Sequence, residues 1–283
     1  MKKSNIFIAA FAVMLAAGAA GNAEDTKADF DGSSGAAARK TMPAFSDVTV
    51  PAPSAPVAEK DADSEDNVLS YMLTLDANSR LYGSEQYVSN DGRILADKYR
   101  AAGYIVLEAQ ASKYPGLYME RYWVFNIKYT APAGQIAWEL DTYASVADYN
   151  LRPYFSEAPL RSEAKILEDK IKEAGYVVLE NRIERYPPVT AAYGATWGCN
   201  IEFIAPAGSA PREIQYLDLW EDGQGKWYMG LPGKAKAEAD GRAAAENLRA
   251  AGYIILKEYV TQGDMTNPNW RWAYNVEYIY PIK

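Results

Sequence analysis

Carboxylates are the side chains of this sequence with which acid–base chemistry could be built. The chain contains no His and one Cys, which excludes Ser-His-Asp and Cys-His catalysis, His-ligated metals and paired-cysteine redox chemistry. A glycosidase needs two carboxyl groups roughly 5–10 Å apart across a cleft. The acids near the expected strands that could supply them are Glu139, Asp141, Asp218, Glu221 and Asp222. Linear spacing pairs none of them, and solvated faces are the simpler interpretation.

Ser162 and Lys165 form an SxxK pattern like that of penicillin-recognising serine enzymes. The companion SDN and KTG motifs are absent, and internal comparison aligns the segment with NDGR (90–93) and ADGR (239–242). This alignment predicts that Ser162 caps a helix and that Lys165 forms a surface ion pair with Asp169, four residues on. We therefore expect no catalytic role for the pattern.

Aromatic side chains near expected hairpin tips offer a different chemistry, because Tyr and Trp can stack on sugar rings or grip an extended peptide. They recur in the connections 112–122, 184–194 and 261–271. The candidate binding residues in these connections are Tyr114, Tyr118, Tyr186, Tyr193 and Trp270. Packing of the same rings over sheet edges is the alternative.

Three asparagines recur at one position of a repeated strand, in WVFNIKY (123–129), WGCNIEF (197–203) and WAYNVEY (272–278). Asn is unfavourable in mid-strand, and a covered amide needs hydrogen-bond partners. One interpretation is an inherited structural bond to a neighbouring turn, and the other is a repeated polar contact with a ligand. Both stay open for Asn126, Asn200 and Asn275.

These candidates lie on an internal repeat with a period of about 75 residues. Besides the tryptophan segments, the chain repeats YRAAGYIVLE (99–108) as IKEAGYVVLE (171–180) and LRAAGYIILK (248–257). The tetrapeptide APAG occurs at 131–134 and again at 205–208. Three anchors with one period identify three degenerate copies of a single unit.

Each copy predicts one helix and several strands. Apolar residues at i, i+4 and i+7, such as Leu95, Tyr99 and Ala102, form the buried stripe of an amphipathic helix, and a glycine then ends it. In each tryptophan segment, alternate residues share one face, which places the aromatic residues in a core and the asparagines opposite. Cys199 aligns with Phe125 and Tyr274 on the inward face, so it is expected to be a small buried hydrophobic residue.

The expected fold is α+β, with three helices and nine mainly antiparallel strands in repeats 67–147, 148–221 and 222–283. A third strand is expected at 135–143 in the first repeat and at 213–220 in the second. The third repeat has no such strand, but a segment of the same character, 67–75, precedes the first helix. One interpretation closes the array by pairing strand 67–75 with 270–281, which would remove two exposed sheet edges. The alternative places three βαββ units in a row.

The N-terminal region predicts export. Residues 1–23 combine Lys2 and Lys3 with an apolar run of roughly 15 residues and a small-residue site, as a secretory signal peptide does, with cleavage after Ala23. The run is shorter than the roughly 20 residues that span a bilayer. Residues 24–66, rich in Pro, Ala and acids and without Tyr or Trp, predict a disordered linker. The expected location is periplasmic or secreted.

A net charge of −8 argues against nucleic acid as a partner. We expect a non-catalytic repeat protein of the bacterial cell envelope with a binding, structural or adaptor role. Its partner would be an envelope glycan, a peptide or another envelope protein, and no cofactor, metal or transmembrane segment is expected in the mature protein. The alternative function is a carboxylate-dependent hydrolase of envelope glycans.

Overall fold

A computed structural model describes residues 67–77, 80–115, 119, 121–145, 154–186, 196–263 and 271–282 of the protein. All of them belong to Thr41–Lys283, one of the two units into which the chain divides. The expected signal peptide (1–23) and linker (24–66) lie outside the described residues, so export and cleavage after Ala23 stay predictions.

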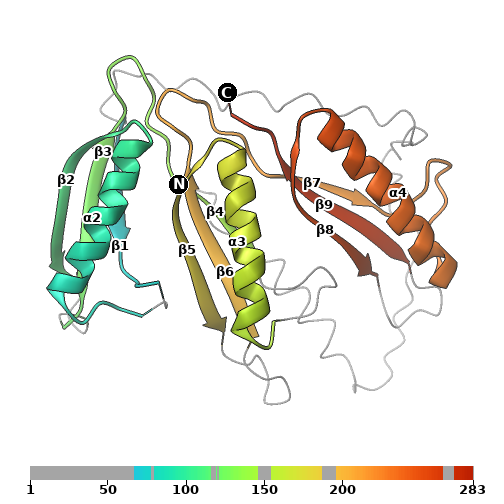
Figure 1. The fold of residues 1–283 in the computed structure, drawn as a ribbon, viewed down its shortest axis with the longest axis horizontal. Coiled ribbons are helices and arrows are strands. Elements are labelled where there is room, and N and C mark those ends of the chain that lie inside the picture. Colours follow the sequence, from blue (N-terminus) through green and yellow to red (C-terminus); the bar gives the residue numbers. More distant parts are fainter. Residues whose placement is uncertain are drawn as a thin grey trace, which may run out of the picture. The chain divides into compact units, whose positions relative to one another are not determined.

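Three βαββ units follow one another along the described chain (Figure 1). The first consists of β1 (Val68–Leu73), α2 (Glu85–Ala101), β2 (Ile105–Lys113) and β3 (Trp123–Thr130). The second consists of β4 (Asp141–Ser145), α3 (Glu157–Glu173), β5 (Val177–Tyr186) and β6 (Thr196–Ile204), and the third of β7 (Gln215–Leu219), α4 (Gly230–Ala250), β8 (Ile254–Gln262) and β9 (Trp272–Ile279). The α+β fold of three repeats, with three helices and nine strands, is confirmed.

Each unit has its own three-stranded antiparallel sheet, in the orders β1-β3-β2, β4-β6-β5 and β7-β9-β8. β1 pairs with β3 and β9 pairs with β7 and β8, so the proposed closure of strand 67–75 onto 270–281 is wrong and the row of βαββ units is correct. The strand before each helix joins the sheet that follows it. β4 therefore belongs to the sheet of the second unit, and β7 to the sheet of the third.

The glycine that ends each helix has the left-handed conformation that the repeat predicts. Gly103, Gly175 and Gly252 have φ of 87°, 92° and 88°. In the first unit, the N–H of Tyr104 donates to the carbonyl of Tyr99 at 3.1 Å, and the other units repeat this contact. A side chain would be strained here, so the glycines fix the turn from helix to strand.

The central strands bury alternate residues, as the period of two predicts. Phe125, Ile127 and Tyr129 of β3 are buried in the core of the first unit, and their counterparts in β6 and β9 are buried likewise. The three tryptophans occupy equivalent positions but are half-buried. Each donates its backbone N–H at 2.8 Å to a tyrosine carbonyl ahead of the helix: Trp123 to Tyr82, Trp197 to Tyr154, and Trp272 to Tyr228.

At the Cys199 position of the repeat, the size of the strand residue is matched to the size of the helix residue that faces it. A Cβ added at Gly92 of α2 would lie 2.1 Å from the Phe125 ring, and one at Gly241 of α4 would lie 2.0 Å from the Tyr274 ring. In the second unit the counterparts are Ala164 and Cys199, both buried in one core. A small helix residue therefore accompanies a large strand residue, and the lone cysteine compensates for the larger alanine.

We predict that Gly92→Ala will lower the free energy of unfolding by roughly 1–3 kcal/mol, because the added methyl group overlaps the Phe125 ring. The sign is informative, since alanine is the better helix former by about 1 kcal/mol. Equilibrium urea unfolding of Gly92→Ala, Phe125→Cys and the double variant tests it. The double variant recreates the Ala164–Cys199 combination and should lose less than the sum of the single losses. A stabilising Gly92→Ala would contradict the close packing.

Consecutive units are joined through the helices. α2 packs on β2 and β3 of its own sheet and also on β5 of the next, and α3 packs on β5, β6 and β8. The C-cap carbonyls of α2 and α3 each accept a backbone N–H from the following unit: the N–H of Ala207 donates to Ala102 at 2.8 Å, and that of Ile282 donates to Ala174 at 2.9 Å. The chain thus contains two related interfaces, which we call interface 1 (first and second units) and interface 2 (second and third units).

Candidate functional site

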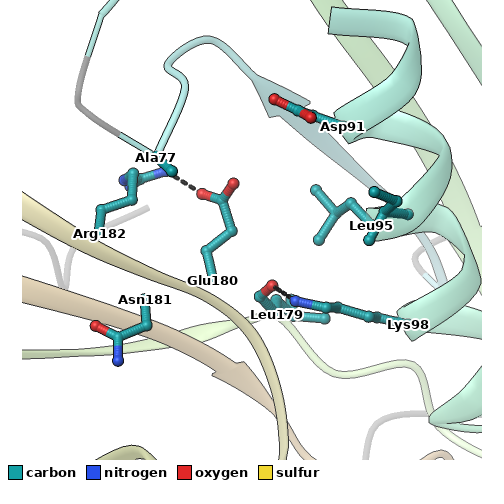
Figure 2. Close-up of a pocket in the computed structure, with 9 residues that line it drawn as sticks. Ala77, Asp91, Leu95, Lys98, Leu179, Glu180, Asn181 and Arg182 are labelled. Carbon is teal, nitrogen blue, oxygen red and sulfur yellow. Dashed lines mark hydrogen bonds and ion pairs between the residues drawn. The ribbon is translucent and has the colours of Figure 1, made fainter. Parts of the chain in front are cut away.

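A pocket with a volume of about 220 Å³ lies at interface 1, between α2 and β5 (Figure 2). Asp91, Leu95 and Lys98 project from α2, and Glu180 and Arg182 project from β5 on the opposite wall. Ala77, Ile94, Leu179 and Asn181 complete the lining. The pocket therefore combines two carboxylates, two cations and an apolar floor.

A β-bulge prepares one wall of this pocket. The register between β5 and β6 shifts between Val178 and Glu180, so Leu179 is the extra residue and its carbonyl is available to the preceding unit. The Lys98 ammonium donates to that carbonyl. Burial lowers the pKa of Lys98, and the nearby Glu180 opposes this shift. The lysine is therefore held as part of the wall.

Arg182 holds two carboxylates together at the other wall. Its guanidinium forms ion pairs with Glu180 on its own strand and with Glu202 on β6. The Tyr71 hydroxyl of the first unit donates to Glu202 at 2.7 Å. Burial raises the pKa of Glu180 to about 7, a shift that Arg182 opposes and Glu202 increases. Glu180 is thus a carboxyl group that titrates near neutral pH at a pocket wall.

The raised pKa of Glu180 predicts that it contributes stability at low pH and that the contribution is lost as pH rises. The folded state then binds the proton more tightly than the unfolded chain does, so stability falls between the unfolded value near 4.5 and the folded value near 7. Glu180→Gln should remove this pH-dependent contribution to the free energy of unfolding. The difference in unfolding free energy between wild type and Glu180→Gln should therefore change by roughly 1–3 kcal/mol between pH 4.5 and pH 8. A difference independent of pH would contradict the assignment.

Interface 2 has the same framework but a different set of charges. Lys170 donates to the bulge carbonyl of Leu256 at 2.8 Å, as Lys98 does to Leu179. The Tyr143 hydroxyl donates to Glu277, as Tyr71 does to Glu202. The position of Glu180 is taken by Lys257, however, and the ammonium of Lys257 lies 2.9 Å from Glu163 of α3. A buried ion pair therefore occupies the place that corresponds to the pocket.

This ion pair is enclosed by further polar groups. Glu163 and Lys257 are only 6% and 4% exposed. The ammonium of Lys257 also donates to the Ser145 hydroxyl at 2.8 Å, and the Tyr154 hydroxyl donates to Glu163. At interface 1 the counterpart of Glu163 is Asp91, which accepts the Tyr82 hydroxyl at 2.8 Å. Because Glu180 cannot pair with Asp91 as Lys257 pairs with Glu163, space remains between α2 and β5.

The sequence did not identify these residues, although it contained a signal. Repeat alignment places Glu108, Glu180 and Lys257 at one position, where two copies are acidic and one is basic. The three tyrosine–acid pairs are Tyr82 with Asp91, Tyr154 with Glu163, and Tyr228 with Asp240, the last at 2.9 Å. A change of charge within an otherwise matched framework marks where the copies differ.

The acids that the sequence suggested as catalytic candidates lie elsewhere, and none of them lines the pocket. Asp141 lies on β4 and Asp218 on β7, in different sheets, and burial raises the pKa of both. Asp222 accepts the backbone N–H groups of Gln224 and Lys226 at 2.9 and 3.0 Å, so it stabilises a turn. Glu139 is exposed and Glu221 is half-buried.

The predicted aromatic residues are described only in part. Tyr118, Tyr193 and Trp270 lie outside the described residues. Tyr114 is half-buried and donates its backbone N–H to Tyr122 at 3.0 Å. Tyr186 is half-buried, donates its hydroxyl to Glu184 at 3.0 Å, and has its pKa raised to about 12 by burial. A binding role for these rings stays a prediction.

The recurrent asparagines form bonds within their own sheets. Asn126 donates to the Ser112 hydroxyl at 2.8 Å, and Asn275 donates to the equivalent Thr261 hydroxyl at 3.1 Å. Asn200 shares a hydrogen bond with Tyr186. These contacts favour the structural interpretation, and ligand binding by these amides stays a prediction.

The structure describes both residues that could act as nucleophiles, Ser162 and Cys199. Ser162 is exposed inside α3, which begins at Glu157, so the prediction that it caps the helix is wrong. Lys165 pairs with Asp169 at 2.6 Å, as predicted. Cys199 is fully buried, and burial raises its pKa to about 11, so the thiol is neutral at pH 7.

Within the described part of the chain, no cluster of three or more Cys, Asp or Glu side chains could hold a metal ion. No helix there is long and apolar enough to cross a membrane. In comparisons with known proteins, no family model, no curated protein and no solved structure matches the chain.

Proposed function

We propose that the protein is an exported, non-catalytic binding or adaptor protein of the bacterial cell envelope. Its partner would be an envelope glycan, a peptide or another envelope protein. The observation that carries the proposal is the pocket at interface 1, which lies where interface 2 holds a buried ion pair. The two interfaces share their framework, so the pocket is a local departure from a structural pattern and a suitable place for a ligand.

The repeated architecture supports binding over catalysis. Three copies of one unit multiply similar surfaces, whereas an active site usually requires unlike residues that converge. Cys199 is buried, Ser162 is exposed, and the ammonium of Lys165 forms an ion pair with Asp169. Export rests on the N-terminal sequence pattern alone.

A retention assay tests the proposal. The full chain, immobilised, is presented with purified sacculi, with soluble glycans and with defined envelope proteins, and soluble products are measured in the same samples. We expect saturable retention of one of these without release of fragments. Asp91→Asn should weaken retention, whereas Glu108→Gln, which changes the exposed counterpart of Glu180, should not. Failure to retain any of them would contradict a binding role.

A carboxylate-dependent hydrolase of envelope glycans is the second candidate, and one observation favours it. A carboxyl group with a pKa of about 7, such as Glu180, is suited to donate a proton at neutral pH, and Asp91 lies on the opposite wall. Steady release of glycan fragments that Glu180→Gln abolishes would establish this candidate and replace the binding proposal. The sequence candidates Asp141 and Asp218 serve as controls in the same assay.

A further inference from the structure

The two interfaces differ in charge at one matched position, which is Glu180 at interface 1 and Lys257 at interface 2. At interface 2 the carboxylates of Glu163 and Glu277 face the ammonium groups of Lys170 and Lys257. At interface 1 three carboxylates face two cations: Asp91, Glu180 and Glu202 against Lys98 and Arg182. Interface 1 therefore has the carboxylate of Glu180 at the position where interface 2 has the ammonium of Lys257, and its second cation, Arg182, lies at the position of Tyr259.

The pocket lies at the place that corresponds to the Lys257 ammonium. Asp91 accepts the Tyr82 hydroxyl with one oxygen, just as Glu163 accepts the Tyr154 hydroxyl. Glu163 directs its other oxygen to the Lys257 ammonium. Asp91 is exposed, whereas Glu163 is buried, and no ion pair of Asp91 is found among the described residues. Arg182 is already shared by Glu180 and Glu202, and Lys98 is bound to the Leu179 carbonyl. The cations of the wall are therefore occupied, and Asp91 remains available.

From this comparison we infer that the pocket at interface 1 binds a primary alkylammonium group, which takes the place that the Lys257 ammonium has at interface 2. The inference deepens the proposed function and rests on it, because it names the ligand chemistry of the same pocket. The carboxylates of Asp91 and Glu180 would accept hydrogen bonds from the ammonium group. Ile94, Leu95 and Leu179 would contact the methylene groups. A volume of about 220 Å³ suffices for such a chain, since one water occupies about 30 Å³ in the liquid. The shared chemistry is that of a lysine side chain or of a free aliphatic amine.

Binding of this ligand should strengthen as pH rises through 7, since the ammonium is attracted to the ionised form of Glu180. The charged and titratable groups that face Glu180 are Tyr71 from β1, Tyr82 ahead of α2, Asp91 and Lys98 from α2, Arg182 from β5, and Glu202 from β6. Burial raises the pKa of Glu180 to about 7. The pH dependence therefore reports on Glu180.

The test measures n-butylammonium binding to the full chain by calorimetry and thermal shift at constant ionic strength, with tetramethylammonium and 1-butanol as matched controls. We expect saturable binding of n-butylammonium alone, weakened at least tenfold by Asp91→Asn and abolished by Glu180→Lys, which places an ammonium opposite Asp91. Glu108→Gln should bind as wild type. Nα-acetyl-lysine amide represents a peptide ligand, and its Nε-acetylated form is the uncharged control. If Nα-acetyl-lysine amide binds more tightly than n-butylammonium, the partner is a protein or peptide.

Lys257→Ala supplies a positive control, because it removes the ammonium from interface 2 and n-butylammonium should restore part of its lost stability. Equal responses of wild type and Asp91→Asn, or no saturable binding to either, would overturn the inference. Retention of sacculi, glycans or envelope proteins is read in a separate assay. If retention persists in Asp91→Asn while n-butylammonium never binds, the ammonium inference fails and the proposed function stands.

Discussion

Replacing Lys257 with alanine should lower the free energy of unfolding by about 3–5 kcal/mol, because the substitution leaves Glu163 buried without its cation. Glu163 would keep the hydrogen bond from Tyr154 but would lose an ammonium 2.9 Å away, and Ser145 would lose its donor. The effect should appear in equilibrium urea unfolding at pH 7 as a lower midpoint.

Two comparisons separate this loss from a general effect of removing lysine. Lys165→Ala removes an exposed ion pair with Asp169 and should leave the urea midpoint close to that of wild type. The double replacement of Glu163 and Lys257 by methionine removes both charges together and should recover most of the loss, because two apolar side chains of similar volume need no desolvation of charge. A Lys257→Ala variant as stable as wild type would contradict a buried ion pair at interface 2.

Truncating Leu179 to alanine should cost about 2–5 kcal/mol, because this side chain fills the junction between the first two units. Leu179 belongs to the bulge of β5 and is 1% exposed within the core of the preceding unit. The measurement is again urea unfolding, together with hydrogen exchange of the α2 amides, which should lose protection when interface 1 is weakened.

Leu107 is the matched control, because it occupies the same bulge position in the first unit. No unit precedes it among the described residues, and it is 52% exposed. Leu107→Ala should therefore change the free energy of unfolding by about 0.5 kcal/mol or less. Equal losses from Leu107→Ala and Leu179→Ala would mean that packing within each sheet, and not packing between units, determines the role of the bulge leucine.

The candidate site could not be predicted from the linear sequence because its members come from different copies of the repeat. Asp91 and Lys98 are contributed by the first unit, and Glu180 and Arg182 by the second. The acids expected from the sequence lie near the predicted third strands, such as Asp141 and Asp218, and the fold places them in separate sheets. Alignment of the copies places Glu180 against Lys257 but does not say that either faces Asp91 or Glu163.

Local interactions explain what the sequence alone determined about this protein. Helices with buried stripes, terminal glycines such as Gly103 and the inward face of β3 all depend on residues within a few positions of one another, so periodicity and glycine placement predict them. Repetition of those local signals then determined that there are three α+β units. The matched sizes at Gly92 and Phe125 were within reach of the same alignment but required knowledge of which helix position faces the strand.

Tertiary structure alone decided which sheet each first strand joins, how the units meet and where the pocket lies. β1 pairs with β3, from which it is separated in the chain by α2 and β2. Nothing within either strand distinguishes β3 from the equivalent β9 as the partner of β1. Lys257 and Glu163 are distant in sequence, and their pairing depends on the packing of α3 against β8. The energy of a buried charge depends on whether an opposite charge lies beside it in space. Interface 2 is therefore closed by its own lysine, while interface 1 retains a pocket.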